Sequence, residues 1–208
     1  MTGAAAPRWS VLVPLKPWHA AKSRLHEIDA RRVDLARAVA LDTLDAVVRS
    51  PAVGAVVVVT ADETIVRAVR AALPGVRIVR EPEVAGIDAA LVRAAAAVGP
   101  ASFRAALPGD LATLRPDELT AALAEASTWP RAVVPDAEGT GTTLLTAAPG
   151  VPWASAYGPG SLRRHVGLGC RALALPETSG LRRDLDTPGQ LAEARDRLGI
   201  RTAARAAA

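Results

Sequence analysis

Val53-Gly-Ala-Val-Val-Val-Val-Thr60 is an almost unbroken run of small and β-branched apolar residues. Strands with one wet face alternate apolar and polar residues, whereas a continuous run is typical of a parallel strand that is buried on both faces. Segments with apolar residues at helical spacing lie on either side of this run, at 28–49 and at 62–73. Helices that flank a buried parallel strand predict an α/β fold.

The alternation of strand and helix continues over the rest of the 208 residues. The other predicted strands are short and largely apolar; they cover 9–15, 76–79, 103–107 and 132–135. No internal repeat and no linker rich in Gly, Ser or Pro divides the chain. We therefore expect one α/β domain over 1–208, with a mostly parallel sheet and helices on both faces. Residues 1–8 are expected to form a flexible leader and residues 201–208 a flexible tail.

The composition favours an enzyme of small anionic substrates over a nucleic-acid-binding protein. The 25 Lys and Arg residues exceed the 21 Asp and Glu residues only slightly, and they are scattered along the chain. A nucleic-acid-binding surface would more often concentrate them beside aromatic residues, which make up only 3% of the chain. The lone cysteine, Cys170, excludes an internal disulfide framework and predicts a cytoplasmic protein. Residues 1–7 do not resemble a signal peptide, and no apolar span reaches membrane length.

A carboxylate follows the strand predicted over 103–107, in the sequence Leu-Pro-Gly-Asp110-Leu. Ligands of open α/β sheets bind at the carboxyl ends of the strands, and Mg²⁺ needs only one or two protein carboxylates. Asp184 and Asp186 lie two apart on a predicted strand end and would face the same side. We expect Asp110 and one of this pair to bind Mg²⁺. Alternatively, Asp110 is a turn residue, and the second aspartate only favours the dipole of the helix predicted from Thr187.

Three positive charges, Lys16, Lys22 and Arg24, fall within nine residues after the first predicted strand. Nucleotide-binding α/β folds hold phosphates at this first connection between strand and helix. The segment is therefore a candidate triphosphate site. A solvated surface turn is the alternative, and it is the commoner explanation of a run of charges.

A glycine-rich turn, Tyr157-Gly-Pro-Gly-Ser161, precedes a short predicted helix. Ser161 is expected to cap this helix, and backbone amides at a helix start can bind an anion. A capped helix without a ligand explains the segment equally well. The histidines show no metal-binding spacing and are expected at the surface, with His19 and His165 as neighbours of phosphate.

Taken together, the motifs resemble the phosphoenolpyruvate or 2-phospho-L-lactate guanylyltransferases of coenzyme F-420 biosynthesis, from about Trp9 to Leu198. Each motif is short, but their order and spacing are fairly specific. They are Pro14-Leu-Lys16 with Ala21-Lys22-Ser23-Arg24-Leu25, Gly86-Ile-Asp88-Ala-Ala-Leu91, Leu107-Pro-Gly-Asp110-Leu111, Gly139-Thr-Gly-Thr-Thr143-Leu, Tyr157-Gly158-Pro-Gly-Ser161 and Asp184-Leu-Asp186-Thr-Pro.

The resemblance implies a Rossmann-like nucleotidyltransferase domain of the glycosyltransferase-A type. It implies that GMP from GTP is joined to phosphoenolpyruvate, which gives enolpyruvoyl-2-diphospho-5'-guanosine and pyrophosphate. Each predicted role belongs to a few residues: Thr143, Gly158 and Ser161 for the acid; Asp110 and Asp186 for Mg²⁺; Lys16, Lys22, Arg24 and Asp110 for catalysis; and Lys16, Lys22, Arg24, Gly86, Asp88, Pro108 and Gly109 for the nucleotide.

One departure from the family pattern concerns Asp88, where the family usually has Asn. A carboxylate lacks the amide donors that Asn could offer to a base or ribose, so the base preference is open. By itself, Asp88 is explained by a capping role at its helix. The open alternatives for function are 2-phospho-L-lactate or 3-phosphoglycerate as the acid, a sugar-phosphate nucleotidyltransferase or glycosyltransferase, and a module that senses GTP. The resemblance also suggests a downstream transferase as partner and a homodimer paired through a protruding hairpin at 140–147.

Overall fold

The computed structural model describes residues 8–18, 32–185 and 187–207, and over these residues a seven-stranded sheet forms the centre of the molecule. Its strand order is β3-β2-β1-β4-β6-β5-β7. The strands are β1 (Trp9–Pro14), β2 (Val53–Thr60), β3 (Arg77–Arg80), β4 (Phe103–Ala106), β5 (Arg131–Pro135), β6 (Thr142–Ala147) and β7 (Arg171–Ala172). The helices are α1 (Arg32–Arg49), α2 (Glu63–Ala72), α3 (Ile87–Val98), α4 (Pro116–Ala126), α5 (Ser161–Gly167), α6 (Pro188–Glu193) and α7 (Ile200–Ala206), with 3-10 turns η3 (Gly180–Arg182) and η4 (Arg195–Arg197).

The sheet is mostly parallel, as the sequence predicted. β1 pairs in parallel with β2 and β4, β2 pairs in parallel with β3, and β5 pairs in parallel with β7. Only β6 runs against its neighbours, because it pairs antiparallel with both β4 and β5. The side chains of all six residues of β6 are buried inside the sheet. The expectation of a protruding hairpin at 140–147 is therefore wrong.

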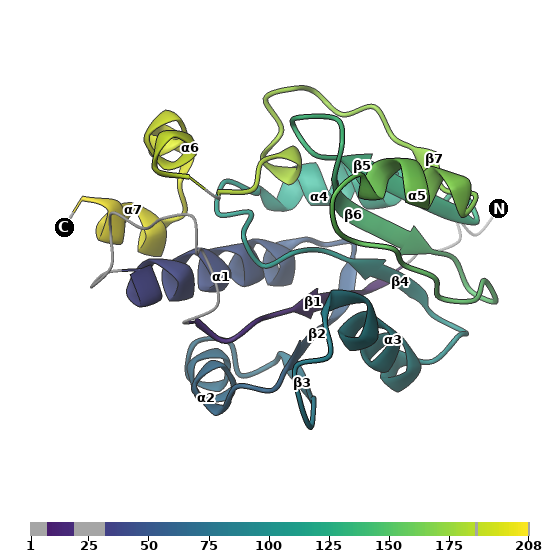
Figure 1. The fold of residues 1–208 in the computed structure, drawn as a ribbon, viewed down its shortest axis with the longest axis horizontal. Helices are drawn as coiled ribbons and strands as arrows, with labels where there is room; N and C mark the ends of the chain where they lie inside the picture. Colours follow the sequence, from purple (N-terminus) through teal and green to yellow (C-terminus); the bar gives the residue numbers. More distant parts are fainter. Residues whose placement is uncertain (1–7, 19–31, 186, 208) are drawn as a thin grey trace, which may run out of the picture.

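The valine run of β2 is buried on both faces of the sheet, which confirms the two-sided packing. Val56 and Val58 belong to the core cluster that includes residues of α1 and α2, whereas Val57 and Val59 belong to the cluster with α3. Figure 1 shows α1 and α3 on opposite sides of the strands. Full burial of each such side chain contributes about 1.5–3 kcal/mol, so β2 joins the two halves of the core.

The chain end differs from its prediction. Residues 201–208 were expected to form a flexible tail, but Ile200–Ala206 forms α7, which packs beside α1. The contact is polar: the buried Asp42 carboxylate of α1 accepts hydrogen bonds from the amide and the hydroxyl of Thr202, at 2.7 and 2.8 Å. Arg201 adds an ion pair to Asp42 at 3.1 Å. An Ala-rich segment with a polar anchor lacks the apolar periodicity that predicts a packed helix.

The segment before α7 follows its prediction in part. Thr187 and Gln190 form the predicted capping box, in which each side chain accepts a hydrogen bond from the backbone amide of the other residue. The helix ends at Glu193 and not near Leu198. Asp184 and Leu185 are in irregular backbone and not at a strand end. Of the helices that the structure describes, none is both long and apolar enough to cross a membrane.

Replacement of Asp42 by Ala is expected to lower the free energy of unfolding by about 2–3 kcal/mol, because the buried groups of Thr202 would lose their acceptor. Urea denaturation measures this change. Asp45→Ala is the matched control on the same helix, since its surface ion pair with Arg49 should contribute less than about 1 kcal/mol. Equal losses in the two variants would contradict the anchoring role of Asp42.

Candidate active site

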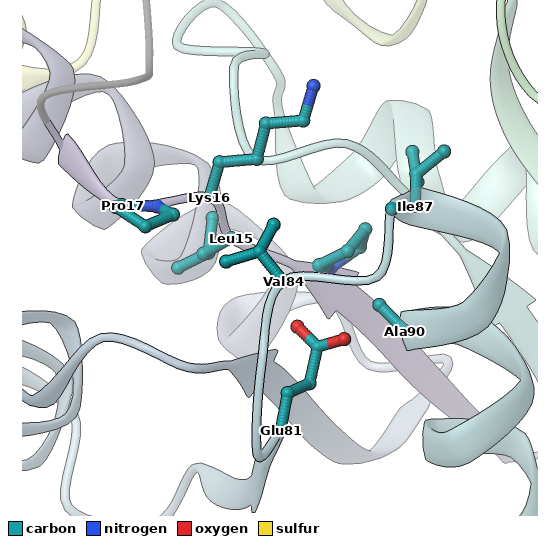
Figure 2. Close-up of a pocket in the computed structure, with 9 residues that line it drawn as sticks. Leu15, Lys16, Pro17, Glu81, Val84, Ile87 and Ala90 are labelled. Atoms are coloured by element: carbon teal, nitrogen blue, oxygen red, sulfur yellow. The ribbon is translucent and has the colours of Figure 1, made fainter.

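A pocket opens where β1 and β3 end and α3 begins (Figure 2). Its lining is largely apolar and carries two charged side chains; the residues are Pro14, Leu15, Lys16, Pro17, Glu81, Val84, Gly86, Ile87 and Ala90. This is the carboxyl edge of the parallel strands, where open α/β sheets bind their ligands. The pocket brings together two residues predicted at the nucleotide, Lys16 and Gly86. Lys16 is exposed, and its side chain extends away from Leu15 and Val84.

Backbone hydrogen bonds fix the loops around this pocket. The Leu15 amide donates to Val59 O at 3.0 Å, so β1 stays paired with β2 beyond its last residue. The Glu81 amide donates to Thr60 O at 3.0 Å in the same way. Gly86 has a φ of +92° at the N-cap position of α3, a conformation that favours glycine. Asp88 is therefore within the first turn of this helix. The expectation that Asp88 is the N-cap is wrong.

Asp110 is half-buried in the loop after β4. The predicted Pro108-Gly109 stretch packs so closely that a Cβ on Gly109 would lie 2.2 Å from Leu15 Cδ2. On the other side, the Leu185 amide donates to the Asp110 carbonyl oxygen at 3.2 Å. That bond brings the backbone of Leu185, the residue after Asp184, to Asp110, although the two lie far apart in the sequence. Asp186 itself lies outside the described residues, as do Lys22 and Arg24.

The carboxylate of Asp110 is the type of ligand that suits a hard divalent cation. Carboxylate oxygens are preferred by Mg²⁺ and Mn²⁺, and the loop of Asp110 is bonded through its backbone to Leu185, the residue after Asp184. Within 8–18, 32–185 and 187–207, no three His, Cys, Asp or Glu residues form a metal-binding group. A Mg²⁺ site does not require such a group, since this ion usually keeps waters and takes phosphate oxygens from the substrate.

The Gly158 turn is held by contacts from α5. Gly158 has a φ of +112°, and its carbonyl oxygen accepts a hydrogen bond from the Ser161 amide at 3.0 Å. Arg164 reaches back to donate hydrogen bonds to three carbonyl oxygens of the turn, those of Ala156, Tyr157 and Pro159. Ser161 is 2% exposed and is the first residue of α5, whose N-cap is Gly160. The structure therefore corrects the expectation that the Ser161 side chain caps this helix.

The third predicted acid-binding residue, Thr143, lies on β6, next to the junction with α5. It is 2% exposed, and its hydroxyl donates to Val134 O at 3.5 Å. The neighbouring Thr142 hydroxyl contacts His165 of α5 at 2.9 Å, and the Leu162 amide donates to Thr140 O at 3.1 Å. The start of β6 and the turn before α5 are thus bonded to each other.

His165 is completely buried, which corrects its expected place at the surface. The Ala156 amide donates to Nε2 at 2.9 Å, so Nε2 carries no proton. We therefore assign the neutral tautomer with the proton on Nδ1, which donates to the Thr142 hydroxyl. Burial lowers the pKa of His165 below its usual value, and the nearby Arg164 acts in the same direction, whereas Asp88 opposes the shift. Neutral His165 is thus a bridge between β6 and the turn.

Asp88 connects the two candidate binding regions. One carboxylate oxygen accepts a hydrogen bond from the Tyr157 amide at 3.2 Å. Since Asp88 belongs to the helix that lines the pocket, this bond joins the pocket to the Gly158 turn. The sequence did not indicate Glu81 as a site residue, and it predicted His165 at the surface, as a neighbour of phosphate. The signal that could have indicated Glu81 was its position after a predicted parallel strand. The burial of His165 had no such signal, because α5 has seven residues and is too short for its buried face to show as periodicity.

The family described as "Guanylyl transferase CofC like" matches residues 9–170. Among curated proteins, a phosphoenolpyruvate guanylyltransferase of Thermomonospora curvata is 45% identical over 204 residues, which cover 96% of this chain and 87% of the relative. A phosphoenolpyruvate guanylyltransferase of Salinispora arenicola is 46% identical over 200 residues, which cover 94% of this chain and 92% of the relative.

Solved structures share the fold. A nucleotidyl transferase from Methanothermobacter has a TM-score of 0.61 at 19% identity, over 91% of this chain and 96% of its own. The Mycobacterium tuberculosis protein Rv0371c, in complex with manganese, has a TM-score of 0.58 at 20% identity, over 90% of this chain and 97% of its own. At such identities the likeness shows the nucleotidyltransferase fold alone.

The protonation of His165 predicts how stability depends on pH. The folded state keeps this imidazole neutral. Its contribution to the free energy of unfolding is therefore present above pH 6.5, the usual histidine pKa, and is lost as the pH falls below that value. Between pH 7.5 and 5.5, wild-type protein should lose more unfolding free energy than His165→Gln, by at most about 1.4 kcal/mol per pH unit below 6.5. Urea denaturation at both pH values gives the difference. Parallel losses in the two proteins would show that His165 does not titrate with unfolding.

Proposed function

The chain belongs to the family of CofC-like guanylyl transferases, and we propose that it joins GMP from GTP to phosphoenolpyruvate. The two relatives compared above carry the name of this activity and cover nearly the whole chain. The product, enolpyruvoyl-2-diphospho-5'-guanosine, belongs to coenzyme F-420 biosynthesis. The observation that carries the proposal is the pocket at the carboxyl edge of the sheet, which lies beside Lys16 and is joined through Asp88 to the Gly158 turn.

The reaction forms one phosphoanhydride bond and breaks another. A phosphate oxygen of phosphoenolpyruvate attacks the α-phosphorus of GTP, and the bond from that phosphorus to the bridging oxygen of the β-phosphate breaks. Pyrophosphate leaves with the electron pair. The step needs neither a covalent enzyme intermediate nor a redox partner, because such transfers depend on alignment and on neutralisation of charge.

In this proposal the guanine occupies the pocket of Figure 2, and the triphosphate extends past Lys16. Lys22 and Arg24, from the segment that follows, add positive charge at the phosphates. Pro108 and Gly109 bring the loop of Asp110 against this region, which is supported by the close packing of Gly109 on Leu15. Two polyanions have to meet, so the cationic side chains offset their repulsion.

The acid is proposed to bind at Thr143, Gly158 and Ser161. The hydrogen bonds from Arg164 to three carbonyl oxygens of the turn support this role, because the guanidinium fixes the turn and adds a positive charge beside it. Asp88 then holds the acid turn at a constant position relative to the nucleotide pocket. Such positioning is what a transfer between two bound substrates requires.

Asp110 and Asp186 would hold the divalent cation, which we propose to be Mg²⁺. When bound, the cation supplies neutralisation of the phosphate charges. Asp110 is carried by the loop that packs on Leu15, and its carbonyl oxygen anchors the segment before Asp186. The manganese in Rv0371c supports the use of a divalent cation in this fold. A cytoplasmic location, a downstream transferase partner and a homodimer stay predictions.

The decisive assay measures pyrophosphate release. We expect release only when GTP and phosphoenolpyruvate are both present, with little from 2-phospho-L-lactate or 3-phosphoglycerate. Preference for one of the other two acids would change the assigned substrate. Release with a sugar phosphate and not with the acids would point to a sugar-phosphate nucleotidyltransferase, and nucleotide binding without any release would point to a GTP sensor.

Asp110→Asn is expected to lower kcat by about 10²–10³-fold, a typical loss for one charge-stabilising group at a reaction centre. Kinetics over a range of Mg²⁺ concentrations would measure this effect, and thermal unfolding would test whether the fold is kept. Asp117→Asn is the control, because Asp117 is exposed in the first turn of α4. A folded Asp110→Asn protein with wild-type kcat would refute the assigned role.

A further inference from the structure

The pocket beside Lys16 has a lining that suits a heterocyclic base. Leu15, Pro17, Val84 and Ile87 supply apolar walls from two different loops and the start of α3. Figure 2 shows these side chains around the space above Glu81. Apolar walls with a few polar groups are typical of small-molecule sites, where the polar groups set orientation and specificity.

Glu81 is the acidic residue among the described residues that line this pocket. Its amide is bonded to Thr60 O, so the residue continues the pairing of β3 with β2 and its backbone is held in place. Figure 2 shows the carboxylate directed from the floor toward Val84 and Ala90. The residue is half-buried, and burial raises the pKa of its carboxyl group although Arg93 acts in the opposite direction. The carboxylate is therefore partly desolvated and would gain from a ligand that donates hydrogen bonds.

Guanine differs from the other common bases in what it offers to such a carboxylate. Its N1–H and its 2-amino group are adjacent donors, and two carboxylate oxygens can accept from both in a bidentate pair. Adenine has an acceptor at N1, whose lone pair would face the negative charge. Xanthine keeps N1–H but carries a carbonyl oxygen at position 2, which would also be repelled.

Asp88, the carboxylate that left the base preference open, has a different contact. Its Oδ1 accepts the hydrogen bond from the Tyr157 amide, at the turn assigned to the acid. Glu81, by contrast, lies on the pocket lining itself. The base-reading role therefore falls to the residue after β3 and not to the residue in the first turn of α3.

We propose that Glu81 determines the specificity for GTP by accepting hydrogen bonds from N1–H and the 2-amino group of guanine. This inference rests on the proposed function, because it takes the pocket as the base site of a guanylyltransferase. It makes Glu81 a specificity-determining residue for that reaction.

The test compares GTP, ITP, XTP and ATP in two measurements on wild-type protein and on Glu81→Gln. The first is kcat/KM for pyrophosphate release with phosphoenolpyruvate. The second is displacement of a ribose-labelled fluorescent GTP, which reports binding without turnover. Glu83→Gln is the control, because Glu83 is exposed two residues further along the same loop and does not line this pocket.

Wild-type protein should bind ITP about 10-fold more weakly than GTP, since inosine lacks the 2-amino group. In Glu81→Gln the preference should move from GTP to XTP, because the amide accepts from N1–H and donates to the carbonyl oxygen at position 2 of xanthine. The GTP value should fall by about 10–10²-fold in this variant. Glu83→Gln should keep the wild-type order.

Equal affinity of wild-type protein for GTP and ITP would overturn the proposal, and this arm needs no variant. An unchanged GTP-over-XTP preference in folded Glu81→Gln would also overturn the proposal. In both cases, pyrophosphate release by wild-type protein would leave the proposed function standing. If wild-type protein released no pyrophosphate, the proposed function would fail, and the displacement assay would still decide whether Glu81 reads guanine.

Discussion

Parallel pairing that continues past the ends of the strands is the constraint on which the site depends. Leu15 and Glu81 both donate their amides to carbonyl oxygens of β2, although neither belongs to a strand. The Leu107 amide likewise donates to Leu12 O of β1 at 3.0 Å. Three loops that carry polar side chains are thereby held at one edge of the sheet before any substrate binds. Preorganisation of this kind reduces the entropy that binding would otherwise cost.

The two candidate binding regions are made by different kinds of structure. The proposed nucleotide site uses the ends of parallel strands and the start of a helix. The proposed acid site uses a turn that is held by the guanidinium of Arg164 and by the buried imidazole of His165. Asp88 joins the two through one hydrogen bond to a backbone amide. An Asn side chain also has an oxygen that can accept this bond, so the departure from the family pattern preserves the contact.

The fold was predictable because its signals are local and strong. The valine run of β2 indicated a strand covered on both faces, and Thr187 with Gln190 indicated the start of α6. The remaining features depend on contacts between distant residues. Thr202 is buried because Asp42 accepts its hydrogen bonds, and no pattern near Thr202 indicates that. Asp110 was found as a candidate from its place after a strand, but its link to Leu185 is a backbone bond that side-chain patterns do not reveal.

The place of β6 has a consequence for how the molecule assembles. β6 separates β4 from β5, so β5, which leaves the ribosome first, has no edge of the growing sheet to join. One route is that β5 and β6 first form a hairpin, which then joins the sheet. The other is that β6 first pairs with β4, and β5 then pairs with β6. Until one of these events occurs, the edge of β4 is open to pairing with another chain. The edge of β4 therefore stays unpaired at least until β6 has been synthesised.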